Sequence, residues 1–86
     1  DFHHKGQEYT ITIGSDIVRD GMYLEVENPL DDVKPLFDIF YSDQTGEMFI
    51  TTFKDDIPLE VMEWAISMAK FTYPQRLEMK QTPQQG

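Results

Sequence analysis

The sequence predicts an α+β domain in which a four-stranded antiparallel sheet is followed by one C-terminal amphipathic helix packed on one face of the sheet. Two segments alternate between apolar and polar residues, a third has two apolar runs around a turn, and a fourth repeats with a period near 3.6 residues. The expected order is therefore β-β-β-β-α. With 86 residues and no internal repeat, the chain is expected to form one domain.

The domain is expected to span residues 8–74. Residues 1–7 are mostly polar and are predicted to be a flexible N-terminal segment. Residues 75–86 are rich in glutamine, and they are predicted to be a frayed polar tail after Pro74, which ends the helix.

The first two strands are predicted from alternation. In residues 8–13 the apolar positions are Tyr9, Ile11 and Ile13. In residues 22–27 they are Met22, Leu24 and Val26, which leaves Tyr23, Glu25 and Glu27 pointing outward. Turn-forming residues lie between the two segments, at positions 14–16 and 20–21.

Residues 36–53 predict a hairpin around the loop Asp43-Gln44-Thr45-Gly46, which fits a type I turn followed by a left-handed glycine. This loop predicts that Tyr41 pairs with Phe49 and that Ile39 pairs with Thr51. One face would then carry Phe37, Ile39, Tyr41, Phe49 and Phe53. The other face would carry Phe40, Met48 and Ile50.

The segment Asp55-Asp56-Ile57-Pro58 is typical of a helix start, because an aspartate can cap free amides and proline suits the first turn. The helix is predicted over residues 59–73. Its polar stripe contains Glu60, Glu63, Ser67 and Lys70. Its apolar side contains Val61, Trp64, Ala65, Met68, Phe71 and Thr72. Trp64 is expected to be largely buried against the sheet face that bears Phe37, Ile39 and Phe53.

The net charge restricts the partners. Sixteen acidic residues and seven basic ones give a formal charge of −9 and a pI near 4.3. Such a chain repels nucleic acid and anionic membrane surfaces and attracts a basic partner protein. The alternative interpretation is that the charge only maintains solubility.

Residue types needed for catalysis are scarce, so we expect a non-enzymatic protein without catalytic residues, metal or cofactor. The chain has no cysteine, which excludes disulfides and thiolate zinc sites. His3 and His4 are adjacent, and in an extended segment they point in opposite directions. The paired carboxylates fall on turns or outward faces, where solvated surface charge is the simpler interpretation. No apolar run approaches the ~18 residues of a membrane span, and we expect a cytoplasmic protein.

Two sets of residues are candidates for interaction. The acidic outer surface, with Tyr23 as its nearest aromatic, is the candidate partner-binding surface: Tyr23, Glu25, Glu27, Asp31, Asp32, Glu60 and Glu63. The apolar residues on the second hairpin face are the candidate homodimer face: Phe40, Met48 and Ile50. An exposed apolar sheet face usually marks an interface. The alternative is that a terminal segment of the same chain covers it.

The segments 40–48 (FYSDQTGEM) and 58–64 (PLEVMEW) resemble the C-terminal part of small acidic bacterial proteins that are uncharacterised or of the immunity type. The resemblance implies a single domain that neutralises a toxin by binding it, and no residue role is carried over. We therefore expect a protein-binding module, in particular an inhibitor of a basic partner. A self-associating, homodimeric structural domain is the alternative. A small hydrolase or ligand-binding domain with an acidic pocket is a third class.

Overall fold

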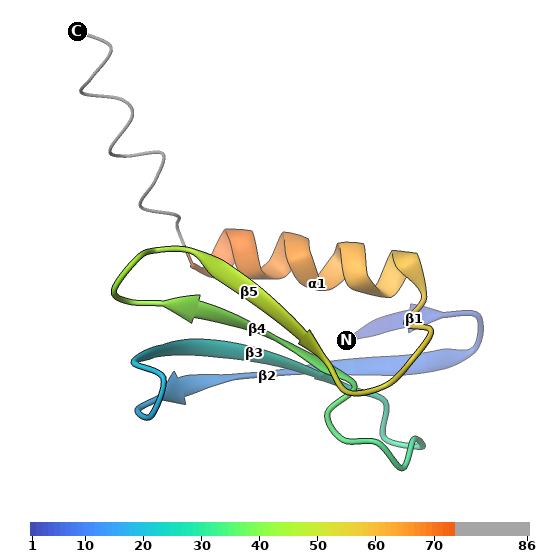
Figure 1. Ribbon diagram of the computed structural model, residues 1–86. Coiled ribbons are helices and arrows are strands. Elements are labelled where there is room, and N and C mark those ends of the chain that lie inside the picture. Colours follow the sequence, from blue (N-terminus) through green and yellow to red (C-terminus); the bar gives the residue numbers. More distant parts are fainter. Residues whose placement is uncertain (74–86) are drawn as a thin grey trace, which may run out of the picture.

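The computed structural model describes residues 1–73 and contains an antiparallel sheet with one helix on one side (Figure 1). The strands are β1 (Phe2–His4), β2 (Gln7–Asp16), β3 (Gly21–Glu27), β4 (Phe37–Ser42) and β5 (Met48–Thr52), and the helix is α1 (Leu59–Thr72). The strands lie in the sheet in chain order. The α+β class, the antiparallel sheet and the C-terminal helix are confirmed, but the sheet has five strands rather than four.

The additional strand lies in the segment that was expected to be flexible. Phe2 pairs with Tyr9 and His4 with Gln7, so residues 1–7 contain β1 and the first residue of β2. Lys5 and Gly6 connect them with φ angles of 49° and 79°, the signature of a tight two-residue hairpin turn. The expected frayed tail, residues 75–86, lies outside the described residues.

Strand β2 is longer than expected, because residues 14–16 are not a turn. Gly14 pairs with Tyr23 and Asp16 with Gly21, so the turn falls at residues 17–20. The Asp16 side chain accepts a hydrogen bond from the Arg19 amide at 3.1 Å, which closes this turn locally.

The predicted register of the second hairpin is wrong by one residue. Tyr41 pairs with Met48 rather than Phe49, and Ile39 pairs with Ile50. The Ser42 amide donates to the Glu47 carbonyl at 2.9 Å, so Ser42 closes a loop that is one residue longer than expected. A slip of one residue moves every β5 side chain to the opposite face. Met48 and Ile50 therefore face the helix, and Phe49 faces away from it.

The core lies between α1 and the sheet. The sheet contributes Leu24, Val26 and Phe37, all without exposed surface. The helix contributes Val61, Ala65 and Ala69, which follow one another at intervals of four residues and are at most 1% exposed. Because these helix residues are small, the helix backbone approaches the sheet closely.

Parts of the helix prediction are corrected. Phe71 and Met68, expected on the buried side, are 87% and 38% exposed. The predicted aspartate cap is also wrong, since Pro58 occupies the N-cap position and no side chain caps the first turn. At the other end, Tyr73 is buried, stacks on Tyr41 and donates its hydroxyl to the Tyr23 carbonyl at 3.0 Å.

Trp64 packs differently from the expectation. It is half-buried, it adjoins the core, and its ring stacks on Phe2 of β1 with 4.9 Å between centroids and 16° between planes. Phe53, expected beside it, is 53% exposed. The partner of Trp64 is thus the strand that the sequence analysis did not predict.

Replacing Trp64 with alanine should lower the free energy of unfolding by about 2 kcal/mol, below the range for a fully buried aromatic residue. Urea unfolding followed by circular dichroism measures this loss. Phe2→Ala should cost about 1–2 kcal/mol, and the double variant should lose less than the sum, because the two rings share one contact. Strict additivity would contradict the stack.

Candidate functional site

The candidate site is the face of strands β2–β5 that is turned away from α1, here called the open face. Figure 1 shows the helix on the other side of the sheet, along its length. The strand pairing arranges the side chains of the open face in two neighbouring rows across the sheet. The aromatic row is Gly14, Tyr23, Phe40 and Phe49, and the acidic row is Thr12, Glu25, Asp38 and Thr51.

The aromatic row lies flat on the sheet because glycines leave room for the rings. A Cβ atom at Gly14 would lie 2.5 Å from the Tyr23 hydroxyl oxygen. A Cβ atom at Gly21 would lie 2.6 Å from two ring carbons of Phe40. The third ring, Phe49 on the outer strand, is 50% exposed and supplies accessible apolar surface.

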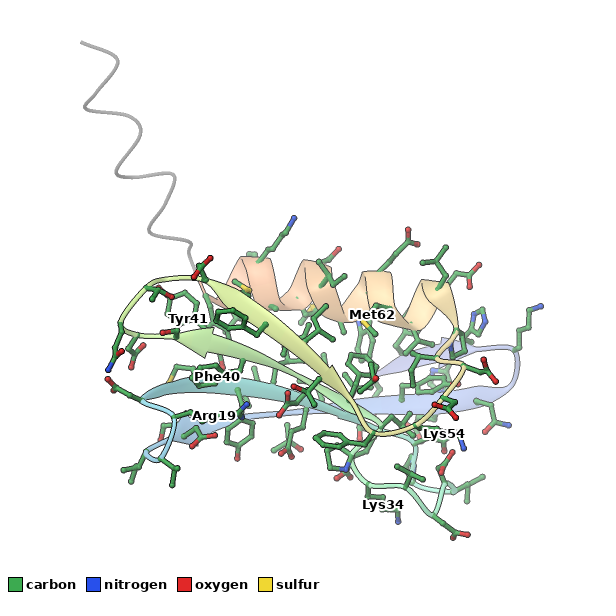
Figure 2. All side chains as sticks on the ribbon, in the orientation of Figure 1. Arg19, Lys34, Phe40, Tyr41, Lys54 and Met62 are labelled. Carbon is green, nitrogen blue, oxygen red and sulfur yellow. The ribbon has the colours of Figure 1, made fainter. Side chains whose placement is uncertain are left out.

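Arg19 covers part of this row. It lies in the β2–β3 turn and folds back so that its guanidinium carbon lies 4.2 Å from the centroid of the Phe40 ring (Figure 2). This geometry is typical of a cation–π contact. The same side chain is hydrogen-bonded to Asp16, which lowers the pKa of that carboxyl and raises the pKa of Arg19.

The acidic row contains a buried carboxylate that is only partly compensated. Asp38 is 6% exposed, and its Oδ2 accepts one hydrogen bond from Arg19 Nη2 at 3.3 Å. Its Oδ1 is buried and has no hydrogen-bond partner among the described residues. A buried acceptor left without a partner costs about 1–3 kcal/mol, and more when it is charged.

Glu25 is paired directly with Asp38 across β3 and β4. Burial raises the pKa of Glu25, and the negative charges of Asp38 and Glu27 raise it further. A like-charge pair at this position destabilises the sheet. The open face therefore holds negative charge at some cost to the fold.

Glu25→Gln should stabilise the protein at pH 7 by about 0.5 kcal/mol, a rise in melting temperature of about 2–4 °C. Because the pKa of Glu25 is raised on folding, its charge destabilises the fold above that pKa. The effect should fade as the pH falls through the ordinary pKa of glutamate and vanish at about pH 3, where this carboxyl is protonated in both states. Thermal unfolding at both pH values tests this, with the exposed Glu63→Gln as control. A gain at low pH would contradict the stated cause.

The structure separates the seven candidate partner-binding residues. Tyr23, Glu25 and Glu27 lie on the open face. Glu60 and Glu63 lie on the exposed side of α1, which belongs to the opposite layer (Figure 1). One interface on a single face of the sheet therefore cannot use both groups.

The remaining two candidates lie in the loop between β3 and β4. Asp31 pairs with Lys54 at 3.0 Å, and its carboxylate accepts a hydrogen bond from the Val33 amide at 2.8 Å. The Val33 amide, followed by Lys54, lowers the pKa of Asp31. Asp31 is thus tied to its own chain, whereas Asp32 is exposed.

The three residues proposed as one dimer face do not share a face. Phe40 lies on the open face under Arg19, and Met48 and Ile50 lie on the helix side. There they line a groove of about 350 Å³ between α1 and the outer strand β5. The other lining residues are Ile39, Gly46, Glu47, Ile66, Ala69 and Lys70. The grouping is wrong because it depended on the register that the structure corrects.

The sequence analysis missed Asp38 and Arg19. Neither residue was identified as a candidate for the site from the sequence. Their contact joins residues 19 positions apart, and only the pairing of β3 with β4 places it. Phe49 was missed on this face because of the register error.

Other chemistry was sought within residues 1–73. No three His, Asp or Glu side chains there are grouped so that they could hold a metal ion. In the same range no helix has the length and hydropathy needed to cross a bilayer. The chain matches no known protein-family model, no curated protein sequence and no solved structure. Function is therefore argued from the geometry of the open face.

Proposed function

We propose that this protein is a non-enzymatic binding module that contacts a basic protein through its open face. The observation that supports this proposal is the pair of carboxylates Glu25 and Asp38 beside an aromatic row whose outer member, Phe49, is half exposed, on a face that α1 does not cover. In the particular form suggested by the resemblance to immunity-type proteins, the module is a bacterial inhibitor that neutralises its basic partner by binding it.

The negative charge of the open face supports a partner with a positively charged surface. Within the described residues, the acidic residues of β3, β4, the end of β2 and the β2–β3 turn include Asp16, Asp20, Glu25, Glu27 and Asp38, and Arg19 is a basic residue among them. Together with the formal charge of −9, this distribution accelerates the approach of a positively charged surface. The association rate should fall as salt shortens the Debye length below about 8 Å.

Shape and polarity support a protein as the partner. Protein interfaces usually combine a few buried aromatic anchors with surrounding polar residues. Phe49, which is half exposed, and Tyr23 supply such anchors next to the carboxylates. The face is a flat sheet surface rather than a deep pocket, and it suits another protein surface better than a small molecule.

The test compares three proteins as bait in affinity capture from the source organism: the wild type, Glu25→Lys/Glu27→Lys, and Glu60→Lys/Glu63→Lys. The two variants change the net charge equally but on opposite layers. We expect a basic protein that the wild type and the helix variant retain and that the open-face variant loses.

The captured protein must then bind the purified wild type with a salt-dependent association rate. Equal binding by all three proteins would exclude the open face as the interface. Loss in the helix variant alone would move the interface to α1.

Self-association is a second candidate function, supported by the composition of β5. This strand lies at the edge of the sheet, its residues 48–52 are all uncharged, and the apolar groove lies next to it. An uncharged hydrophobic edge strand is prone to pair with another copy.

The two candidates differ in their response to salt. Because each copy carries a formal −9, high salt should favour homodimers through β5 and weaken binding to a basic partner. Sedimentation analysis at low and high salt measures the first effect, and Ile50→Lys should abolish it by placing a charge on the edge strand. A monomer under all conditions would exclude this candidate.

A further inference from the structure

We propose that Asp38 and Glu25 form the site on the open face that receives an arginine side chain of the partner. This inference rests on the proposed function and names the group that the face recognises. The combination that supports it is a buried carboxylate oxygen without a partner and a second carboxylate directly opposite on the next strand.

Within residues 1–73, one oxygen of the Asp38 carboxylate accepts no hydrogen bond. Arg19 bonds Oδ2 at 3.3 Å, and Oδ1 has no partner in the described part of the chain. In a protein interior, buried carboxylates are normally paired or accept several hydrogen bonds. A cationic donor from the partner would bond Asp38 Oδ1. The carboxylate, which destabilises the free protein, would then attract the partner.

Glu25 supplies the second half of the site. It is paired with Asp38 across the strands, and the positive charge of Arg19 offsets part of the pKa rise that burial, Asp38 and Glu27 cause. Directly opposed Cβ atoms in an antiparallel sheet are about 4.5–5.5 Å apart. A group with several donors in one plane can therefore contact both carboxylates at once.

Access requires a small movement, because Oδ1 itself is shielded from solvent. The Arg19 side chain, which bonds Asp38 Oδ2, is 40% exposed, and Glu25 lies directly opposite Asp38 on β3. Rotation of Glu25 toward an approaching cation requires no change in the backbone. Rearrangements of this size are common when protein interfaces form.

The chemistry favours arginine over lysine. A guanidinium group presents five donors in a planar fork, whereas an ammonium group is a compact point charge. A guanidinium can also stack on the neighbouring aromatic row. Arg19 already shows this mode inside the chain, over Phe40 and against Asp38. The partner's arginine would repeat it on the Glu25 side.

The experiment titrates the protein with N-acetyl-arginine amide and, separately, with N-acetyl-lysine amide, and follows the side-chain carboxyl carbons by NMR. We expect saturable shifts at Asp38 and Glu25, with about tenfold weaker binding of the lysine compound. Glu25→Gln should weaken arginine binding by about tenfold while the protein remains folded. The exposed Glu63→Gln serves as the matched control, with unchanged binding.

If the NMR spectrum of Asp38→Asn shows a folded protein, this variant should abolish the chemical-shift change at Glu25. If the variant is unfolded, Glu25→Gln still tests the site. Equal shifts for both cations, spread over carboxylates such as Glu63, would mean ionic screening and would overturn the proposal. Absence of any shift at Asp38 and Glu25 would also overturn it. The proposed function would still stand in that case if the captured partner is lost on Glu25→Lys/Glu27→Lys.

Discussion

Phe37→Ala is expected to lower the free energy of unfolding by about 3–5 kcal/mol, which is most of the stability of a domain this small. Phe37 has no exposed surface and lies on β4, an interior strand of the sheet, between Val26 and Thr52. Its removal leaves a cavity that the neighbouring strands and the helix cannot fill without breaking their own contacts. Urea unfolding followed by circular dichroism measures the loss.

Phe71→Ala is the matched control, because it removes the same atoms from a side chain that is 87% exposed. It should change the free energy of unfolding by no more than about 0.5 kcal/mol. A large loss for Phe71, or a small one for Phe37, would contradict the assignment of faces on β4 and α1.

The features that repeat along the chain could be predicted from the sequence. The alternation in residues 22–27 places Leu24 and Val26 in the core, as observed, and the helical period places Val61 and Ala65 there. These predictions depend on neighbours within a few residues, so local pattern is sufficient. The helix prediction fails where the pattern is ambiguous, since Phe71 is apolar but follows the buried Ala69 by two residues, which places it on the opposite side of the helix.

The hairpin register could not be predicted from local pattern, because the turn Asp43-Gln44-Thr45-Gly46 fits loops of two lengths. Within the loop, Ser42 Oγ accepts a hydrogen bond from the Thr45 amide at 3.2 Å, and the Gly46 amide bonds the Ser42 carbonyl at 2.8 Å. These contacts favour the longer loop. Strand β1 was missed because three residues are too few to show a period.

The candidate site depends on register more than the core does. Glu25 was identified as an outward acidic residue, but its partner Asp38 becomes visible only when β3 and β4 are aligned. The same alignment places Gly21 beside Phe40, and the alignment of β2 with β3 places Gly14 beside Tyr23. The sequence analysis interpreted both glycines as turn-forming residues. In the sheet they allow aromatic rings to lie flat on the open face.

Gly21→Ala is expected to cost about 3 kcal/mol, at the upper end of the range for overpacking. The added Cβ would lie 2.0 Å from the carbonyl oxygen of Tyr41 and 2.6 Å from the Phe40 ring. The oxygen belongs to the backbone of β4, so relief of the clash requires that β3 and β4 separate locally. Urea unfolding should show a lower midpoint with a similar slope.

Gly14→Ala distinguishes a backbone clash from a side-chain clash. Its Cβ would meet the outer end of the Tyr23 ring, 2.5 Å from the hydroxyl oxygen, and this ring can swing into solvent. The expected cost is only about 1 kcal/mol. Because the variant remains folded but moves an aromatic residue off the open face, it should also slow capture of a partner that contacts Tyr23. If Gly14→Ala destabilised the protein as much as Gly21→Ala does, Tyr23 would be a fixed part of the fold and not an adaptable contact residue.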